Sequence, residues 1–295
     1  MSFPASAPEA GAASAAELVA CGSIEMGAHR PQDAAVIAAL LPSGTPVYVN
    51  HLPRHRLADA LASLIAVREA GLEPVPHIAA RHIGSRDELT AFLERAVGEA
   101  QVRKALVLGG DEPEARGPYA DGAALIREGV LAASGLREIG LPGYPEGHPR
   151  ILSAELERDL HEKLGLAAAH GLGRYVVTQF CFAPARIVEY CAALSRRAPG
   201  VPVYVGLAGP TSLAALLRFA QRCGVSASLR ALQAQGLNAV RLVTHTEPGA
   251  QLAALAHYCG AHADCNVVGV HVFSFGGVTA AAGWMNRIVA ARRAA

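Results

Sequence analysis

The chain has 295 residues, 52% of them hydrophobic and 17% charged, so it can bury the core of one large domain. Its net charge of +1 and aromatic content of 5% offer neither a basic nor a base-stacking surface, which argues against nucleic acid as a partner. No apolar run approaches the roughly 20 residues that a membrane helix needs, so no membrane partner is expected.

The six cysteines show no C-x-x-C spacing, and several fall inside predicted elements, where a free cysteine behaves as a small buried hydrophobe. A reducing cytoplasm is therefore the expected location. Residues 1–16 are rich in Ala, Ser and Pro but have neither a cationic start nor a continuous apolar core. They predict a disordered leader rather than a signal peptide, followed by a single domain over residues 17–295.

Short apolar runs alternate with helical patterns along the rest of the chain. The predicted strands cover residues 18–24, 46–49, 73–76, 106–108, 137–141, 174–178, 201–205 and 267–274. The predicted helices cover residues 32–41, 57–70, 87–100, 119–133, 153–170, 185–197, 212–222, 227–235 and 250–262, with a last helix that runs through residue 292. Extra helices are thus expected between the seventh and eighth strands.

Strands that alternate with helices at this spacing indicate a parallel sheet with right-handed crossovers. About eight such units favour a closed (β/α)8 TIM barrel over an open doubly wound sheet. The segment after the first strand, Ile24-Glu-Met-Gly-Ala-His29, also lacks the G-x-G-x-x-G pattern of the open alternative. In a barrel the active site lies at the carboxyl ends of the strands, where hydrogen-bonding side chains and glycines gather here. These predicted strand tips are Glu25, Asn50, His51, His77, Gly110, Asp111, Tyr144 to His148, Gln179, Gly206 and Gly276.

Two carboxylates among these strand tips are candidates for catalytic or ligand-binding residues. Glu25 could act as a general acid if burial raises its pKa toward neutrality, or it could be a strand-end carboxylate in a salt bridge. Asp111 could bind a polar ligand or set the charge near a cofactor. Because Gly-Asp-Glu-Pro is also good turn chemistry, Asp111 could equally be a turn residue.

The histidines do not form a recognisable metal motif. His77 and His148 could ligate a metal together with Asp111 or Glu146, but the sequence has no H-x-H or H-E-x-x-H spacing, so no metal site is predicted. The pair His51 and His55 is expected on a solvated loop surface.

Glycine-rich segments follow the seventh and eighth predicted strands, at Gly206–Thr211 and Ser274–Gly277. They fit the phosphate site that barrels often build there, or ordinary tight turns. From the residues alone, the chain is a barrel enzyme with a neutral-to-acidic ligand pocket.

Taken together, several motifs resemble the methylenetetrahydrofolate reductase family. They occur in the family's order at similar spacing and cover nearly the whole chain after the leader, and Y-P-E-x-H-P and T-Q-F are the specific ones. The matching stretches are Ser23-Ile-Glu25, Pro76-His77, Gly109-Gly-Asp-Glu-Pro113, Tyr119-Ala120, Tyr144-Pro-Glu-Gly-His-Pro149 and Val177-Thr-Gln-Phe180.

The resemblance implies a (β/α)8 barrel that carries FAD and moves a hydride between NAD(P)H, the flavin and tetrahydrofolate. The substrate pair would be 5,10-methylene- and 5-methyltetrahydrofolate. By this similarity Glu25 is the general acid, Asp111 helps to bind folate and favours a cationic intermediate, and Gln179 contacts folate. The positions that match flavin contacts are Asn50, His77, Gly109, Gly110, Asp111, Tyr119, Ala120, Tyr144 and His148.

The chain also departs from the family, because Gly109 stands where an arginine is usual and Phe273–Gly277 lacks the family's arginine. The sequence leaves open the nicotinamide preference, the physiological direction of the reaction and the oligomeric state. A homo-oligomer is one of the states left open. Two alternatives remain. One is a flavin- or folate-binding subunit that needs a partner chain, and the other is a barrel enzyme of another class with a phosphate-bearing substrate at the loops after strands seven and eight.

Overall fold

The computed structural model describes residues 14–51, 55–211, 219 and 247–293. Eight parallel strands close into a barrel in which each strand pairs with the next and the last pairs with the first. This confirms the predicted (β/α)8 barrel. The strands are β1 (Ser23–Met26), β2 (Pro46–Val49), β3 (Glu73–Ala79), β4 (Lys104–Leu108), β5 (Glu138–Gly143), β6 (Gly173–Thr178), β7 (Val203–Ala208) and β8 (Val267–Phe273).

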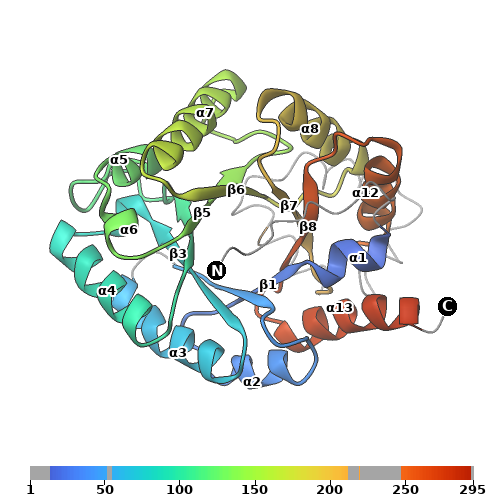
Figure 1. Cartoon of the computed structure of the whole chain (residues 1–295), viewed down its shortest axis with the longest axis horizontal. Helices are drawn as coiled ribbons and strands as arrows, with labels where there is room; N and C mark the ends of the chain where they lie inside the picture. The colour runs from blue at the N-terminus through green and yellow to red at the C-terminus, as the bar shows by residue number, and fades with distance from the viewer. Residues whose placement is uncertain (1–13, 52–54, 212–218, 220–246, 294–295) are drawn as a thin grey trace, which may run out of the picture.

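Helices surround the ring of strands (Figure 1). They are α1 (Ala15–Ala20), α2 (Asp33–Ala38), α3 (Leu61–Glu69), α4 (Arg86–Gly98), α5 (Gly122–Arg127), α6 (Val130–Ala133), α7 (Ser153–Ala169), α8 (Pro184–Arg197), α12 (Gly249–Ala261) and α13 (Val278–Arg293). Two 3-10 helices, η1 (Leu57–Ala60) and η2 (Ala80–His82), follow β2 and β3. In the part of the chain that the structure describes, each helix is too short or too polar to cross a bilayer.

The strands bury both faces. Outward side chains such as Ile24, Val47 and Ile78 pack against the helices in the main core. Inside the barrel, a second cluster holds Tyr48, Val75, Leu106, Tyr175 and Val177. The hydroxyl of Tyr48 donates to that of Tyr175 over 3.0 Å. The barrel interior is therefore packed with side chains rather than open.

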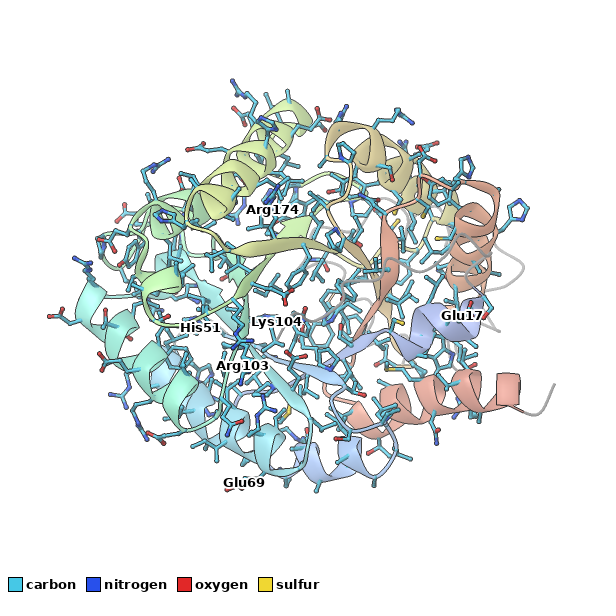
Figure 2. The ribbon with its side chains drawn as sticks, viewed as in Figure 1. Glu17, His51, Glu69, Arg103, Lys104 and Arg174 are labelled. Atoms are coloured by element: carbon cyan, nitrogen blue, oxygen red, sulfur yellow. The ribbon has the colours of Figure 1, made fainter. Side chains whose placement is uncertain are left out.

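One glycine makes room for this interior packing. A Cβ atom at Gly140 of β5 would lie 2.6 Å from the ring of Tyr175, closer than real contacts allow. Below the tyrosines, Lys104 lies 3.4 Å from Glu138 and 4.0 Å from Glu73 at the amino ends of their strands. Figure 2 shows Lys104 within the ring of strands. These three charged groups lie together at the amino end of the barrel.

The first strand was predicted over residues 18–24, and this start was wrong although the strand itself exists and extends past Glu25 to Met26. Leu18 and Val19 are buried on helix α1, and β1 begins only at Ser23. Ser14 accepts a hydrogen bond from the backbone of Glu17, and the Glu17 side chain accepts one from the backbone of Ser14, so a capping box starts a helix here. Residues 1–13 of the predicted leader lie outside the described residues, and Ala15 and Ala16 already belong to α1.

Other boundaries also differ from the predictions. His77 lies inside β3 rather than at its tip, because this strand continues to Ala79. The helix predicted over residues 119–133 is two helices, α5 and α6, separated by Gly129 with φ of +75°. Strand β7 extends to Ala208. The helices predicted over residues 212–222 and 227–235 lie outside the described residues, apart from residue 219.

Candidate active site

The carboxyl end of the barrel brings Glu25 and Asn50 together. Glu25 shares the inward face of β1 with Ser23, two residues before it. The amide nitrogen of Asn50, which directly follows β2, lies 3.4 Å from Oε1 of Glu25. The amide oxygen of Asn50 accepts a bond from the backbone of Ala28 over 3.3 Å, which fixes the direction of the amide. Two predicted site residues from adjacent strands are thus in contact.

Glu25 is set up to hold a proton near neutral pH. Burial raises the pKa of its carboxyl group from 4.5 to about 7, and the bond from Asn50 partly opposes this rise. A carboxyl group with such a pKa is populated in both protonation states at physiological pH. That property is what a general acid requires.

Two buried histidines line the interior near this carboxyl group. Among the residues that the structure describes, the Nε2 atoms of His77 and His271 have no hydrogen-bond partner. The Nδ1 atom of His271 lies 2.9 Å from the hydroxyl of Ser23, and Tyr48 packs edge-on against both imidazoles. Burial lowers the pKa of both histidines to about 3, so both are neutral and polar.

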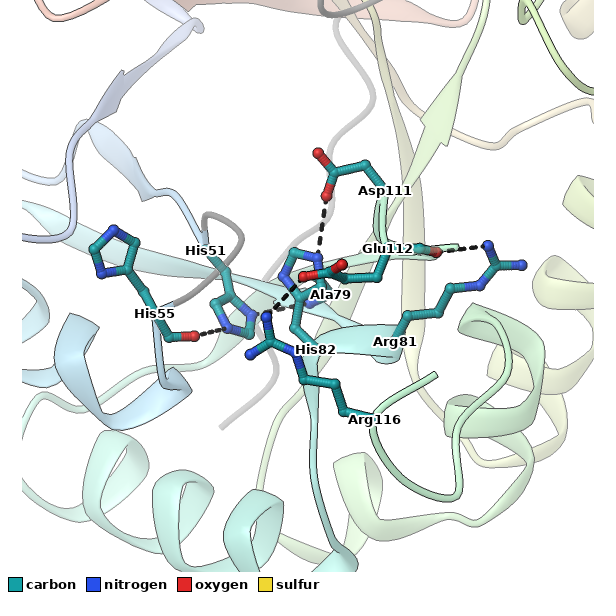
Figure 3. A network of polar contacts seen from close by, with 8 residues as sticks. All are labelled: His51, His55, Ala79, Arg81, His82, Asp111, Glu112 and Arg116. Carbon is teal, nitrogen blue, oxygen red and sulfur yellow. Dashed lines mark hydrogen bonds and ion pairs between the residues drawn. The ribbon is translucent and has the colours of Figure 1, made fainter. Parts of the chain in front are cut away.

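Asp111 follows β4 and is held by a histidine from the neighbouring η2 (Figure 3). Its Oδ1 lies 3.1 Å from Nε2 of His82, whose side chain is 2% exposed, against 57% for Asp111. Gly110, with φ of +91°, allows this approach, since a Cβ atom there would lie 3.3 Å from the His82 ring. The carboxylate is therefore anchored at one oxygen and still reaches solvent.

The network in Figure 3 continues from His82 to the loop after β2. The ring of His82 meets His51 edge-on, with centroids 5.0 Å apart. The Nδ1 atom of His51 accepts from the backbone of Ala79 over 3.4 Å, so its Nε2 carries the proton and donates to the carbonyl of His55 over 3.2 Å. Burial, followed by the nearby His82, lowers the pKa of His51 to about 4. The expectation of a solvated His51 was wrong, because this side chain forms a buried link between two loops.

Arg81 ties the same region to the segment before α5. Its Nε donates to the carbonyl of Ala120 over 2.7 Å, and its Nη1 donates to the carbonyl of Glu112 over 3.1 Å. Ala120 is exposed, while Tyr119 is buried and its hydroxyl donates to Glu128. The neighbouring Gly109 has open space where a side chain would stand.

The residues predicted after β5 form contacts with one another and line a cavity. The rings of Tyr144 and His148 meet edge-on at 5.5 Å, and Nδ1 of His148 accepts from the backbone of Arg150 over 3.2 Å. Tyr144 lines a cavity of about 610 Å³ between α7 and α8, which Glu25 and Asp111 do not line. Tyr144 therefore lines a cavity of its own, beside helices α7 and α8.

Gln179 directly follows β6, as predicted. Its Oε1 accepts a bond from the backbone of Phe180 over 3.1 Å, and its own backbone nitrogen donates to Gly143 over 2.7 Å. The side chain is partly exposed, so it is available to a ligand.

The glycine of the alternative phosphate site has a packing explanation. Gly206 lies within β7, and a Cβ atom there would lie 2.1 Å from the carbonyl oxygen of Thr178. Its backbone nitrogen donates to the hydroxyl of Thr178 over 2.8 Å. Gly206 therefore allows strands β6 and β7 to pack closely, and this packing explains the glycine without a phosphate ligand.

Sequence reasoning missed His82 and His271, and it misplaced His51. Each belongs to a buried contact between segments far apart in the chain, such as the 29 residues between His82 and Asp111. The sequence signal available was weak. His271 lies in an apolar strand pattern where a polar residue stands out, and His82 lies close after Pro76-His77.

Known proteins resemble this chain in sequence pattern and in fold. The profile of the methylenetetrahydrofolate reductase family matches residues 53–271. A solved structure described as an uncharacterized protein from Clostridium thermocellum that binds two copies of 5-methyl-5,6,7,8-tetrahydrofolic acid is 14% identical, with a TM-score of 0.61. That alignment covers 90% of this chain and 95% of the other. A dihydropteroate synthase from Thermus thermophilus is also 14% identical, with a TM-score of 0.47 and coverage of 92% and 93%.

Proposed function

The chain belongs to the methylenetetrahydrofolate reductase family, and we propose on this premise that it is a cytoplasmic flavoenzyme acting on folate. It interconverts 5,10-methylene- and 5-methyltetrahydrofolate by hydride transfer through FAD, with NAD(P)H as the partner in electron exchange. The Clostridium thermocellum protein of the same fold, which binds a methylated tetrahydrofolate, supports the substrate class.

The observation that carries this proposal is the environment of Glu25. The family match begins at residue 53, so the role of Glu25 depends on its surroundings rather than on the match. Its carboxyl group has a pKa of about 7 because it is buried, and it contacts an amide rather than a cation. In the proposed reaction, Glu25 donates a proton to N10 of the substrate as the five-membered ring opens.

The residues around Glu25 fit a flavin ring. The unpartnered Nε2 of His77 is a buried polar group that lacks a ligand, and the open face of Gly109 leaves room for a flat molecule. Asn50, His77 and Gly109 would hold the ring, with Gly110 and Asp111 beside it. When bound, the flavin supplies the hydride chemistry, while the protein supplies orientation and charge.

Asp111 has a different task in this proposal. Its carboxylate, held by His82, lies against the positive charge that develops on the folate as its ring opens. Gln179 contacts the same substrate through its amide. Because His82 fixes Asp111 before the substrate arrives, little rearrangement is needed in the transition state.

The absorbance spectrum of the purified protein, with and without added FAD, tests the cofactor. We expect a bound flavin whose absorbance is bleached by 5-methyltetrahydrofolate or by NAD(P)H. Protein that binds no flavin at saturating FAD, yet binds folate, would instead favour a subunit that needs a partner chain.

A further inference from the structure

Three side chains from two loops meet at the carboxyl end of the barrel, outside the site described above. His29 follows β1, while His55 and Asp59 follow β2. One ligating atom of each lies within 4.8 Å of the others. The closest pair is Nε2 of His29 and Nδ1 of His55, which are 2.7 Å apart. Two imidazoles and a carboxylate in such proximity form a donor set that binds divalent transition metals.

We propose that His29, His55 and Asp59 bind one first-row divalent transition metal of the zinc class. Imidazole nitrogen suits Zn²⁺, Co²⁺ and Ni²⁺, whereas Ca²⁺ and Mg²⁺ prefer sites made of oxygen atoms. Three protein ligands leave at least one coordination position for water. The site is distinct from the proposed flavin and folate contacts, and the inference does not depend on them.

The geometry of the histidine pair is close to that of a metal site. At 2.7 Å the two imidazole nitrogens share a proton in a hydrogen bond. Tetrahedral zinc, with Zn–N bonds of about 2.0–2.1 Å, separates two such nitrogens by roughly 3.3 Å. His29 is exposed and can move by this small amount, and the ring that donates the hydrogen bond binds the metal as its other neutral tautomer, with its proton on the second ring nitrogen.

The ligands are already oriented by their neighbours. The backbone carbonyl of His55 accepts from His51 over 3.2 Å, which holds this residue against the barrel. Oδ2 of Asp59 accepts from the backbone of Arg56 over 2.9 Å, and its Oδ1 lies 3.8 Å from the exposed guanidinium of Arg56. An exposed ion pair at this distance contributes little, so Oδ1 remains available to a cation. The metal would join the loop after β1 to the loop after β2, next to the strands that carry Glu25 and Asn50.

Titration of untagged, chelator-treated protein with Co²⁺ tests the site, because Co²⁺ in a nitrogen and oxygen environment absorbs differently from Co²⁺ bound to thiolate. We expect one Co²⁺ per chain with no thiolate absorption, and displacement of Co²⁺ by Zn²⁺. His29→Gln should weaken binding by more than the roughly 10–100-fold that loss of an outer-sphere partner costs. His257→Gln, which removes an exposed histidine from α12, is the matched control and should bind as the parent does.

Three outcomes would overturn the proposal. They are the absence of binding at millimolar metal, a thiolate spectrum, and unchanged affinity in folded His29→Gln. A thiolate spectrum would point to Cys259 and Cys265, whose sulfur atoms lie 3.1 Å apart. A circular dichroism spectrum verifies that the variant is folded. His55→Gln provides a second variant, which should reduce the affinity to a similar extent and add little when combined with His29→Gln.

Discussion

Glu25 and Asp111 stand at the same end of the barrel, three strands apart, in opposite surroundings. Glu25 is half-buried and contacts the neutral amide of Asn50, and burial is the main cause of its raised pKa. Asp111 has a side chain that is 57% exposed and contacts the imidazole of His82. In the proposed reaction, Glu25 delivers a proton and Asp111 stabilises the cationic intermediate.

The comparison shows that position at a strand end does not fix the chemistry of a carboxylate. In the sequence, both acidic residues come at the end of a short apolar run. The difference comes from neighbours that are distant in sequence, namely Asn50 for Glu25 and His82 for Asp111. Substitution of either carboxylate, or of Asn50, should therefore change one environment and leave the other intact.

Removal of the proton donor should have the largest effect. We expect Glu25→Gln to lower the turnover of folate by about 10²–10⁴-fold, because this is what a positioned general acid contributes. FAD binding should persist, since the amide has nearly the same shape. Stopped-flow measurement of flavin reoxidation by methylenetetrahydrofolate checks this, with Glu94→Gln on α4 as the control. Full turnover in Glu25→Gln would refute the acid assignment.

Loss of the charge at Asp111 should have a smaller effect. Asp111→Asn can keep a contact to His82 but cannot stabilise a cation, so kcat/KM should fall by about 10–100-fold. Steady-state kinetics would show the loss in kcat as well as in KM. Glu114→Gln removes an exposed carboxylate from the same loop and should leave both constants unchanged.

The stability of the protein should also report on Glu25. Between pH 4.5 and pH 7 the unfolded chain releases the Glu25 proton while the folded chain keeps it, so this group destabilises the fold increasingly as pH rises. Above pH 7 the destabilisation is complete. Glu25→Gln should therefore be more stable than the parent by about 1–3 kcal/mol at pH 8, with a smaller gain near pH 5. Denaturant unfolding at both pH values measures this, and an equal gain at both would contradict the pKa assignment.

The smallest predicted effect concerns Asn50. Its bond lowers the pKa of Glu25, so Asn50→Ala should raise that pKa and move the alkaline limb of the kcat/KM profile to higher pH. Because the bond is long, at 3.4 Å, we expect a shift of about half a pH unit or less. A limb that moves to lower pH would show that Asn50 acts in another way.

The barrel itself was predictable because its signals are local. Strand β2 occupies residues 46–49 as predicted. Gly71, which has a positive φ, follows the end of α3, also as predicted. The error at β1 was avoidable, since Ser14-Ala-Ala-Glu17 is a capping-box sequence before an apolar run. At β3 the predicted strand ended at Pro76, but Pro74 and Pro76 both pair with β2 and the strand continues to Ala79.

The candidate site was predictable only in part. The placement of Glu25, Asp111 and Gln179 at the carboxyl end follows from the alternation of strands and helices. The contact between His82 and Asp111, and the buried position of His51, depend on how three loops pack after the barrel closes. No periodicity in the sequence encodes such packing, which is why His82 was not recognised.

The charged group formed by Lys104, Glu73 and Glu138 has a consequence for how reactants arrive. Because these side chains occupy the amino end and Tyr48 and Tyr175 fill the space above them, we expect a ligand to reach Glu25 from the carboxyl end of the barrel. In the proposed reaction, NAD(P)H and folate would then approach Glu25 from the same end of the barrel. We expect the first product to leave before the second substrate binds, which gives parallel lines in double-reciprocal steady-state plots.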